Sequence, residues 1–280
     1  MGGLSTTGEP AERRNGQLGQ ALAAVRSQLA LVTLLLVLTA IAWWSTADRM
    51  AGMDAGPGTE LGALGWFLGV WVVMMAAMMF PSVAPTVALY ATMTRQRGLD
   101  RPLIFAAAYL VVWSGAGLAA YGLFELGRRI TGGDLAWQTG GRWFAAGILV
   151  AAALYELTPI KNVCLAKCRS PVGFLIGSWR EGRIGALKMG ATHGAWCLGC
   201  CWALMAALFA LGVMSLTWMA MFAALIALQK LLPWSRGLVW GTSAVLLVLA
   251  VAVLIEPTAV PGLVIPGSSH QAMNGMGMTR

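Results

Sequence analysis

The sequence predicts an all-α fold, a polytopic membrane helix bundle of about seven transmembrane helices. Hydrophobic residues occupy 58% of the 280 positions and charged residues only 11%, whereas soluble domains contain about 25% charged residues. Several apolar runs approach the roughly 20 residues that a helix needs to cross the hydrocarbon core of a bilayer. Short polar segments separate these runs, so successive helices are expected to cross in opposite directions.

The composition divides the chain into three regions. Residues 1–27 are polar and are expected to form a flexible cytoplasmic tail. Residues 28–256 contain all the long apolar runs and are expected to form the transmembrane bundle. Residues 257–280 contain His270 and several methionines, and are expected to form a flexible extracytoplasmic tail.

The expected transmembrane helices can be placed one by one. They cover approximately residues 28–44, 66–93, 102–126, 143–159, 185–211, 213–229 and 237–255. Pro81 and Pro85 lie inside the second helix and are expected to kink it, which membrane helices tolerate. The longest internal connection, 161–185, has an apolar middle between basic residues, so a short helix on the membrane surface is expected over 172–179.

The positions of the basic residues predict the orientation of the bundle. If the N-terminus lies inside, most of the 19 Lys and Arg residues fall in cytoplasmic segments, as the positive-inside rule requires. We therefore expect the N-terminus in and the C-terminus out. The net charge of +8 then reflects topology and does not indicate a nucleic-acid partner. The sequence also contains no P-loop or other nucleotide-binding pattern.

The strongest chemical signal lies in the fifth expected helix. It contains His193, Cys197, Cys200 and Cys201, whose spacings of three and four residues place an imidazole and several thiols on neighbouring parts of one helix face. These groups are ligands for soft or borderline metal ions. Buried cysteines also occur as small hydrophobic residues, but ionisable groups at mid-membrane depth favour a functional site.

The second expected helix supplies thioethers at a similar depth. Met75, Met78 and Met79 lie near its midpoint, and Met75 and Met79 are four residues apart. Thioethers and thiolates together favour Cu(I). A row of methionines is also compatible with ordinary packing, since methionine fills irregular gaps in helix bundles.

Two further cysteines and an acidic residue lie near the cytoplasmic end of the fourth expected helix. Cys164 and Cys168 have a spacing found in zinc ligand pairs, and they are expected either to dock a metal ion or to be two surface thiols. Glu156 is expected to reach the membrane interface with its carboxylate. The alternative is that it pairs with a cation or with Lys161.

Three segments carry a resemblance to a known family. They are Met74-Met75-Ala-Ala-Met78-Met79-Phe-Pro81, Tyr155-Glu156-Leu-Thr158-Pro159-Ile-Lys161-Asn-Val-Cys164-Leu-Ala-Lys-Cys168, and Gly190-Ala-Thr-His193-Gly-Ala-Trp-Cys197-Leu-Gly-Cys200-Cys201-Trp202. Over roughly residues 60–255 the chain resembles a bacterial family of unknown function, described as predicted metal-binding integral membrane proteins. The resemblance implies a multi-pass protein of the bacterial cytoplasmic (inner) membrane, and it brings no substrate or reaction.

These observations support one leading hypothesis, a membrane protein that binds a transition metal ion, with Cu(I) favoured over zinc. Its role would be metal transfer, insertion or transport, and a metallochaperone or a membrane complex would be its partner. The candidate metal ligands are His193, Cys197, Cys200, Cys201, Cys164, Cys168, Met75, Met78 and Met79. No catalytic residue is predicted.

Two alternatives use the same cysteines differently. In the first, the protein is a membrane thiol redox protein, although adjacent residues such as Cys200 and Cys201 point apart on a helix and are poorly placed for a disulfide. In the second, the protein is a structural or assembly partner of another membrane complex, and its cysteines only fill space in the core.

Overall fold

The computed structural model describes residues 29–48, 63–94, 98–131, 140–211, 215–232 and 235–256. Within these residues the secondary structure is helical throughout, which confirms the predicted all-α class. The two predicted tails, 1–27 and 257–280, lie outside the described residues, so the expectations about them stay predictions.

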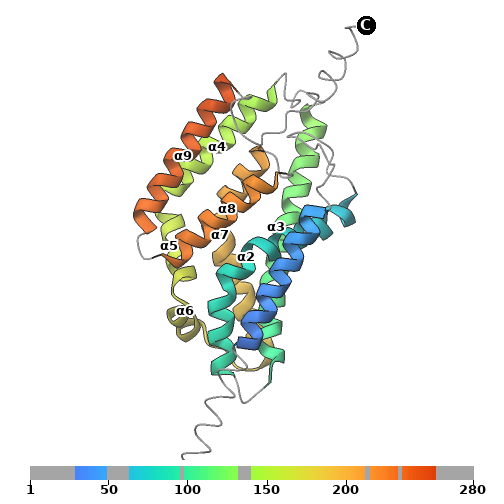
Figure 1. Cartoon of the computed structure of the whole chain (residues 1–280), viewed down its shortest axis with the longest axis vertical. Coiled ribbons are helices and arrows are strands. Elements are labelled where there is room, and N and C mark those ends of the chain that lie inside the picture. The colour runs from blue at the N-terminus through green and yellow to red at the C-terminus, as the bar shows by residue number, and fades with distance from the viewer. Residues whose placement is uncertain are drawn as a thin grey trace, which may run out of the picture.

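The described helices pack side by side as a bundle (Figure 1). An N-terminal helix covers Leu29–Asp48. The helices that follow are α2 (Leu64–Met93), α3 (Asp100–Thr131), α4 (Arg142–Glu156), α5 (Pro159–Arg169), α6 (Pro171–Ser178), α7 (Gly182–Leu211), α8 (Leu216–Leu231) and α9 (Ser235–Ile255).

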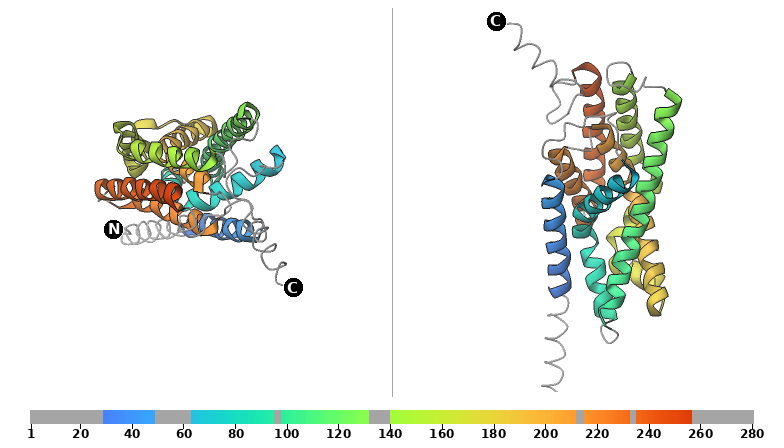
Figure 2. Two further views of the ribbon diagram at one scale, coloured as in Figure 1. Left: turned by 90° about the horizontal axis from the view of Figure 1, so that it is seen from above. Right: turned by 90° about the vertical axis from the view of Figure 1, so that its right-hand side faces the viewer.

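Helix α7 connects most of the bundle, because it packs against α3, α4, α5, α6 and α8. Helix α2 contacts α3 and α8, and α4 runs beside α9, as Figures 1 and 2 both show. Small residues permit the close approach of α3 and α7. A Cβ at Gly190 would lie 2.2 Å from the Phe105 carbonyl oxygen, and one at Gly194 would lie 3.2 Å from the Tyr109 carbonyl oxygen. Glycines at this spacing let two helix backbones touch.

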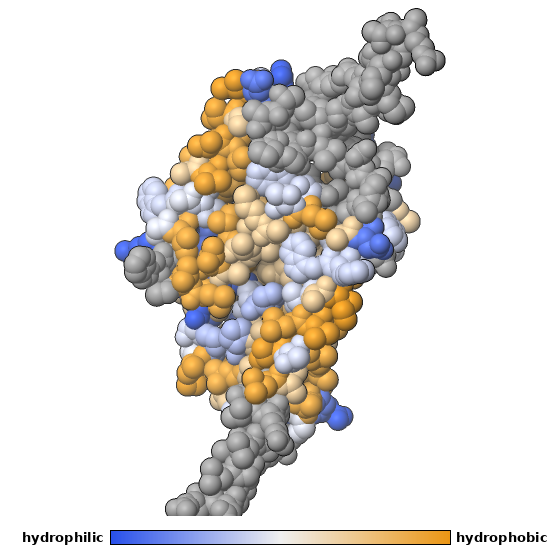
Figure 3. Space-filling view, in the orientation of Figure 1, coloured by the Kyte–Doolittle hydropathy of each residue, from blue (hydrophilic) through white to orange (hydrophobic). Residues whose placement is uncertain are grey.

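Five helices are long and apolar enough to cross a membrane: Leu29–Asp48, Leu64–Met93, Asp100–Gly127, Gly182–Leu211 and Arg236–Ile255. The bent pair α4 and α5 raises the number to six if it is one span. The surface has broad apolar areas (Figure 3), as expected for side chains that face lipid.

The predicted count of seven is therefore not confirmed. Two expected spans account for the difference: the fourth is the bent pair α4 and α5, and the sixth is helix α8, which has only 16 residues. At about 1.5 Å per residue it is roughly 24 Å long, shorter than the ~30 Å hydrocarbon core. The residues before it, 212–214, lie outside the described part of the chain.

The connection after α4 differs from the expectation in a way that matters for the site. The fourth helix was expected to reach residue 159, but α4 ends at Glu156 and α5 begins at Pro159, with a bend of 67° between them. Thr158 caps α5 by accepting a hydrogen bond from the Lys161 amide at 3.3 Å, and Pro159 occupies the first helical position. Both are standard signals of a helix start.

The remainder of that connection is also helical. Ser170 caps α6 in the same way, through a 3.2 Å hydrogen bond from the Gly173 amide, and Pro171 follows it. The short helix expected over 172–179 is thus present as Pro171–Ser178. The stretch before it, for which the sequence analysis predicts no helix, is helix α5, which packs against α7.

Candidate metal centre

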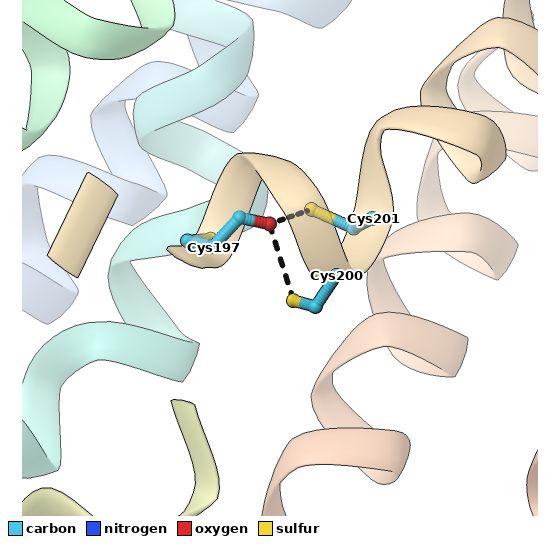
Figure 4. Close-up of side chains that lie close together, drawn as sticks. All are labelled: Cys197, Cys200 and Cys201. Atoms are coloured by element: carbon cyan, nitrogen blue, oxygen red, sulfur yellow. Dashed lines mark hydrogen bonds between the residues drawn. The ribbon is translucent and has the colours of Figure 1, made fainter. Parts of the chain in front are cut away.

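Three thiols of α7 form a compact buried group. The sulfur atoms of Cys197, Cys200 and Cys201 all lie within 4.8 Å of one another, and the side chains are only 1%, 2% and 1% exposed. The group exists because α7 is regular here. Cys200 and Cys201 donate to the Cys197 carbonyl oxygen at 3.1 and 2.9 Å, as Figure 4 shows.

Cys164 and Cys168 of helix α5 lie next to this group of thiols. The Cys168 sulfur lies 3.8 Å from the Cys200 sulfur. Gly199 makes this approach possible, because a Cβ at that position would lie 2.7 Å from the Cys164 sulfur. The interpretation of Cys164 and Cys168 as surface thiols is wrong, since both are buried on the α5 face that contacts α7.

Three residues that the sequence analysis did not select complete the surroundings of Cys197. The Tyr109 hydroxyl of α3 is hydrogen-bonded to the Cys197 sulfur at 2.9 Å. The Lys230 ammonium of α8 donates to the same sulfur at 3.0 Å and to the Ser82 hydroxyl of α2 at 3.2 Å. The Cys197 thiol is therefore contacted by side chains of α3 and α8, and the positive charge of Lys230 lies beside it.

From the sequence alone, Lys230 is expected to be a basic residue that flanks the turn at Pro233. It is buried, with 7% exposure. Burying an ammonium in an apolar bundle is costly and marks a functional position by default. The local signal for this position is the polar pair Gln229-Lys230 at the end of an otherwise apolar helix.

The predicted methionine ligands fall into two groups. The Met79 sulfur lies 4.0 Å from the Lys230 ammonium, so it belongs to the surroundings of Cys197. Met75 and Met78 are buried in the same core, and their participation in a site stays a prediction.

His193 is buried one helical turn before Cys197. Its ring packs against Phe174, Phe105 and Tyr109, with centroid distances of 4.7, 5.9 and 6.0 Å. Among the described residues its Nδ1 has no hydrogen-bond partner. His193 is not a member of the compact three-thiol group, so its role as a ligand is still a prediction.

A second polar cluster lies at the break between α4 and α5. Glu156 and Lys161 form an ion pair in which neither side chain is exposed. Gln229 of α8 accepts from Lys161 at 2.8 Å and donates to Glu156 at 3.0 Å and to Thr242 of α9 at 3.0 Å. The expectation that Glu156 reaches the interface is wrong. The alternative, a charge pair with Lys161, is what the structure shows, because the bend turns both side chains inward.

The donor set at the three thiols suits a soft metal ion. Thiols, a nearby thioether and an imidazole favour Cu(I) among the common ions, although four thiols are also the ligand set of structural zinc sites. The fold and the site together define a helical protein with a buried cluster of soft ligands that fits a metal-binding role.

The comparison with family models agrees with this chemistry. A model named PpoB2 and described as a copper chaperone matches residues 68–253. Because the match covers well over half of the 280 residues, the chain belongs to this family. The metal-binding resemblance found in the sequence is thus confirmed in the form of a copper-related family. Neither the curated proteins nor the solved structures gave a match.

Proposed function

We propose that this protein is a multi-pass protein of the bacterial cytoplasmic membrane that binds Cu(I) at its thiol cluster and passes the ion to an acceptor. The observation that carries the proposal is the buried group of Cys197, Cys200 and Cys201 on α7. Membership in a copper chaperone family supports copper as the cargo. The five or six candidate spans support the membrane location.

The ligand geometry suits an ion that must be released again. Cu(I) is held by soft thiolate and thioether ligands, and the cluster offers more of these than two or three bonds require. Cys168 lies 3.8 Å from Cys200 and belongs to a different helix. The ion could therefore move between ligands of α7 and α5 one bond at a time, without leaving a sulfur environment.

His193 extends the row of ligands along α7. It is four residues before Cys197, and Met189 is four residues before it, so at about 1.5 Å per residue the three positions are spaced by ~6 Å along the axis. All three side chains are buried. Within the proposal, the Nδ1 of His193, which has no hydrogen-bond partner in the part of the chain that the structure describes, is the next ligand that an ion meets on its way to or from the thiols.

The test is the metal content of the full chain after purification in a mild detergent. The wild type should bind Cu(I) in a fixed ratio, and the double variant Cys197→Ser/Cys200→Ser should lose it. Met219→Leu is a matched control, because Met219 is a buried sulfur residue of α8, and it should bind like the wild type. Equal copper in the wild type and in the double variant would sink the proposal.

One observation favours a second candidate, a thiol redox protein. Cys168 and Cys200 are separated by 3.8 Å between sulfurs on different helices, a closer approach to disulfide geometry than adjacent cysteines on one helix allow. Oxidation by an added disulfide reagent would join the two sulfurs, and the reagent would take up the two electrons and two protons and be reduced to two thiols. Reversible loss of two alkylatable thiols on mild oxidation, abolished by Cys168→Ser, would favour this function over copper transfer.

A further inference from the structure

The Lys230 ammonium lies among the atoms that would bind the metal ion. Its neighbours are the Cys197 sulfur at 3.0 Å, the Ser82 hydroxyl at 3.2 Å and the Met79 sulfur at 4.0 Å. All three are lone-pair acceptors, and they come from α7 and α2. A charged group held by three contacts in the bundle interior places a fixed positive charge next to the thiol cluster.

We propose that Lys230 is a specificity-determining residue that makes the thiol site favour monovalent Cu(I) over divalent ions such as Zn²⁺. The inference rests on the proposed Cu(I) site. Coulomb repulsion between the ammonium and a bound ion is proportional to the charge of the ion. With the same thiols ionised, Zn²⁺ is repelled twice as strongly as Cu(I), and buried charges are little screened by salt.

The thiols alone do not provide this discrimination. Cys197, Cys200 and Cys201 lie within 4.8 Å of one another, and the Cys168 sulfur is 3.8 Å from that of Cys200. Four neighbouring cysteines are the usual ligands of tetrahedral structural zinc. A site built to carry copper therefore needs an element that disfavours zinc, and recognition commonly uses a repulsive group for that purpose. Lys230 provides such a group, because its ammonium contacts the Cys197 sulfur at 3.0 Å.

A packing role for Lys230 makes a different prediction. If Lys230 only filled space, an uncharged residue of similar length would leave the relative affinity for the two ions unchanged. If Lys230 only supported the fold, its replacement would weaken both ions in the same proportion. The ratio of the Cu(I) affinity to the Zn²⁺ affinity separates the electrostatic role from both of these.

The experiment compares the full-length wild type, Lys230→Gln and Lys230→Arg in detergent. Each is titrated with Cu(I) and with Zn²⁺ against chromogenic chelators of known affinity. Lys230→Gln should lower the Cu(I)-to-Zn²⁺ affinity ratio about tenfold or more, the effect of removing one charge a few ångströms from the ion. Lys230→Arg keeps the charge and should retain most of the preference.

Lys188→Gln is the matched control. Lys188 is exposed on α7, the same helix as the thiols, so the change in net charge is identical while the buried site is untouched. Its affinity ratio should equal that of the wild type. If Lys230→Gln does not fold, Lys230→Leu is titrated in its place, because it removes the charge without introducing a new ligand.

The outcomes distinguish a failure of the proposed Cu(I) site from a failure of the proposed role of Lys230. A wild type that does not bind Cu(I) at all defeats the proposed function and this inference with it. A wild type that binds Cu(I), together with a neutral Lys230 variant whose affinity ratio is unchanged or shifted towards copper, overturns only the role of Lys230.

Discussion

The buried pair Glu156–Lys161 offers a quantitative test of how the break between α4 and α5 is held. Lys161→Met removes the cationic partner of Glu156, whose carboxylate stays buried. The Gln229 amide is then its remaining hydrogen-bond donor in this cluster. Removing one partner of a buried ion pair costs about 3–5 kcal/mol, because the other charge stays buried without compensation. We expect Lys161→Met to lower the free energy of unfolding by an amount in that range.

The double variant Glu156→Leu/Lys161→Met should be less damaged than Lys161→Met alone. It removes both charges, so the uncompensated carboxylate is gone. The Gln229 amide keeps Thr242 as an acceptor, and its carbonyl oxygen loses the Lys161 donor. One unsatisfied buried oxygen costs about 1–3 kcal/mol. Glu156→Leu alone leaves the Lys161 charge buried and should also cost about 3–5 kcal/mol. The loss in the double variant should therefore be at least about 3 kcal/mol smaller than the sum of the two single losses, which is the coupling energy of the double-mutant cycle.

The five cysteines provide the assay, because all are buried. Unfolding by SDS in mixed micelles exposes them, and a fluorogenic maleimide then reports the unfolded fraction at each SDS concentration. The wild type, both single variants and the double variant complete the cycle. Single-variant effects that simply add in the double variant would refute the reasoning, since the two side chains would then act independently.

The same assay can measure the change in stability caused by alanine at Gly190 and at Gly199, two positions of close helix contact. Gly147→Ala is the shared control. A Cβ at Gly147 meets nothing within 4 Å, so that change should stabilise the helix by about 0.5–1 kcal/mol. Gly190→Ala should destabilise by about 1–3 kcal/mol, because its Cβ would lie 2.2 Å from the Phe105 carbonyl oxygen and the α3 backbone cannot rotate away; a stability equal to that of the control contradicts this. Gly199→Ala should cost less, about 1 kcal/mol, because its Cβ would meet the Cys164 sulfur at 2.7 Å and a side chain can turn aside; a larger loss than for Gly190→Ala contradicts that order.

The fold class and the thiol group could be predicted because both depend on short-range patterns. Apolar runs of suitable length predict long helices, and cysteines three and four residues apart on a helix must lie together. Glycines in membrane helices often allow close approach of a second helix, and Gly190 and Gly199 do so here. Their partners could not be predicted, since nothing local indicates that the first contacts α3 and the second α5.

The structure differs from the prediction mainly in the segment between α4 and α7, where two local signals mark helix starts. Thr158-Pro159 and Ser170-Pro171 are both a capping residue followed by proline at the first helical position, and each begins a helix. Recognising the first would have placed Cys164 and Cys168 on a helix. The inward direction of that helix, which brings Cys168 to Cys200, depends on the 67° bend and on packing against α7, and these are tertiary effects.

Helix α8, an apolar helix of 16 residues, joins the two polar clusters. Gln229 contacts the Glu156–Lys161 pair, and Lys230 contacts Cys197. Consecutive residues on a helix point about 100° apart, so α8 serves both clusters only in one rotation about its axis. Each cluster therefore fixes the rotation that the other needs. This mutual constraint explains why a 16-residue helix retains two adjacent polar side chains in an apolar interior, and it ties the placement of Lys230 beside the thiols to the ion pair at the end of α4.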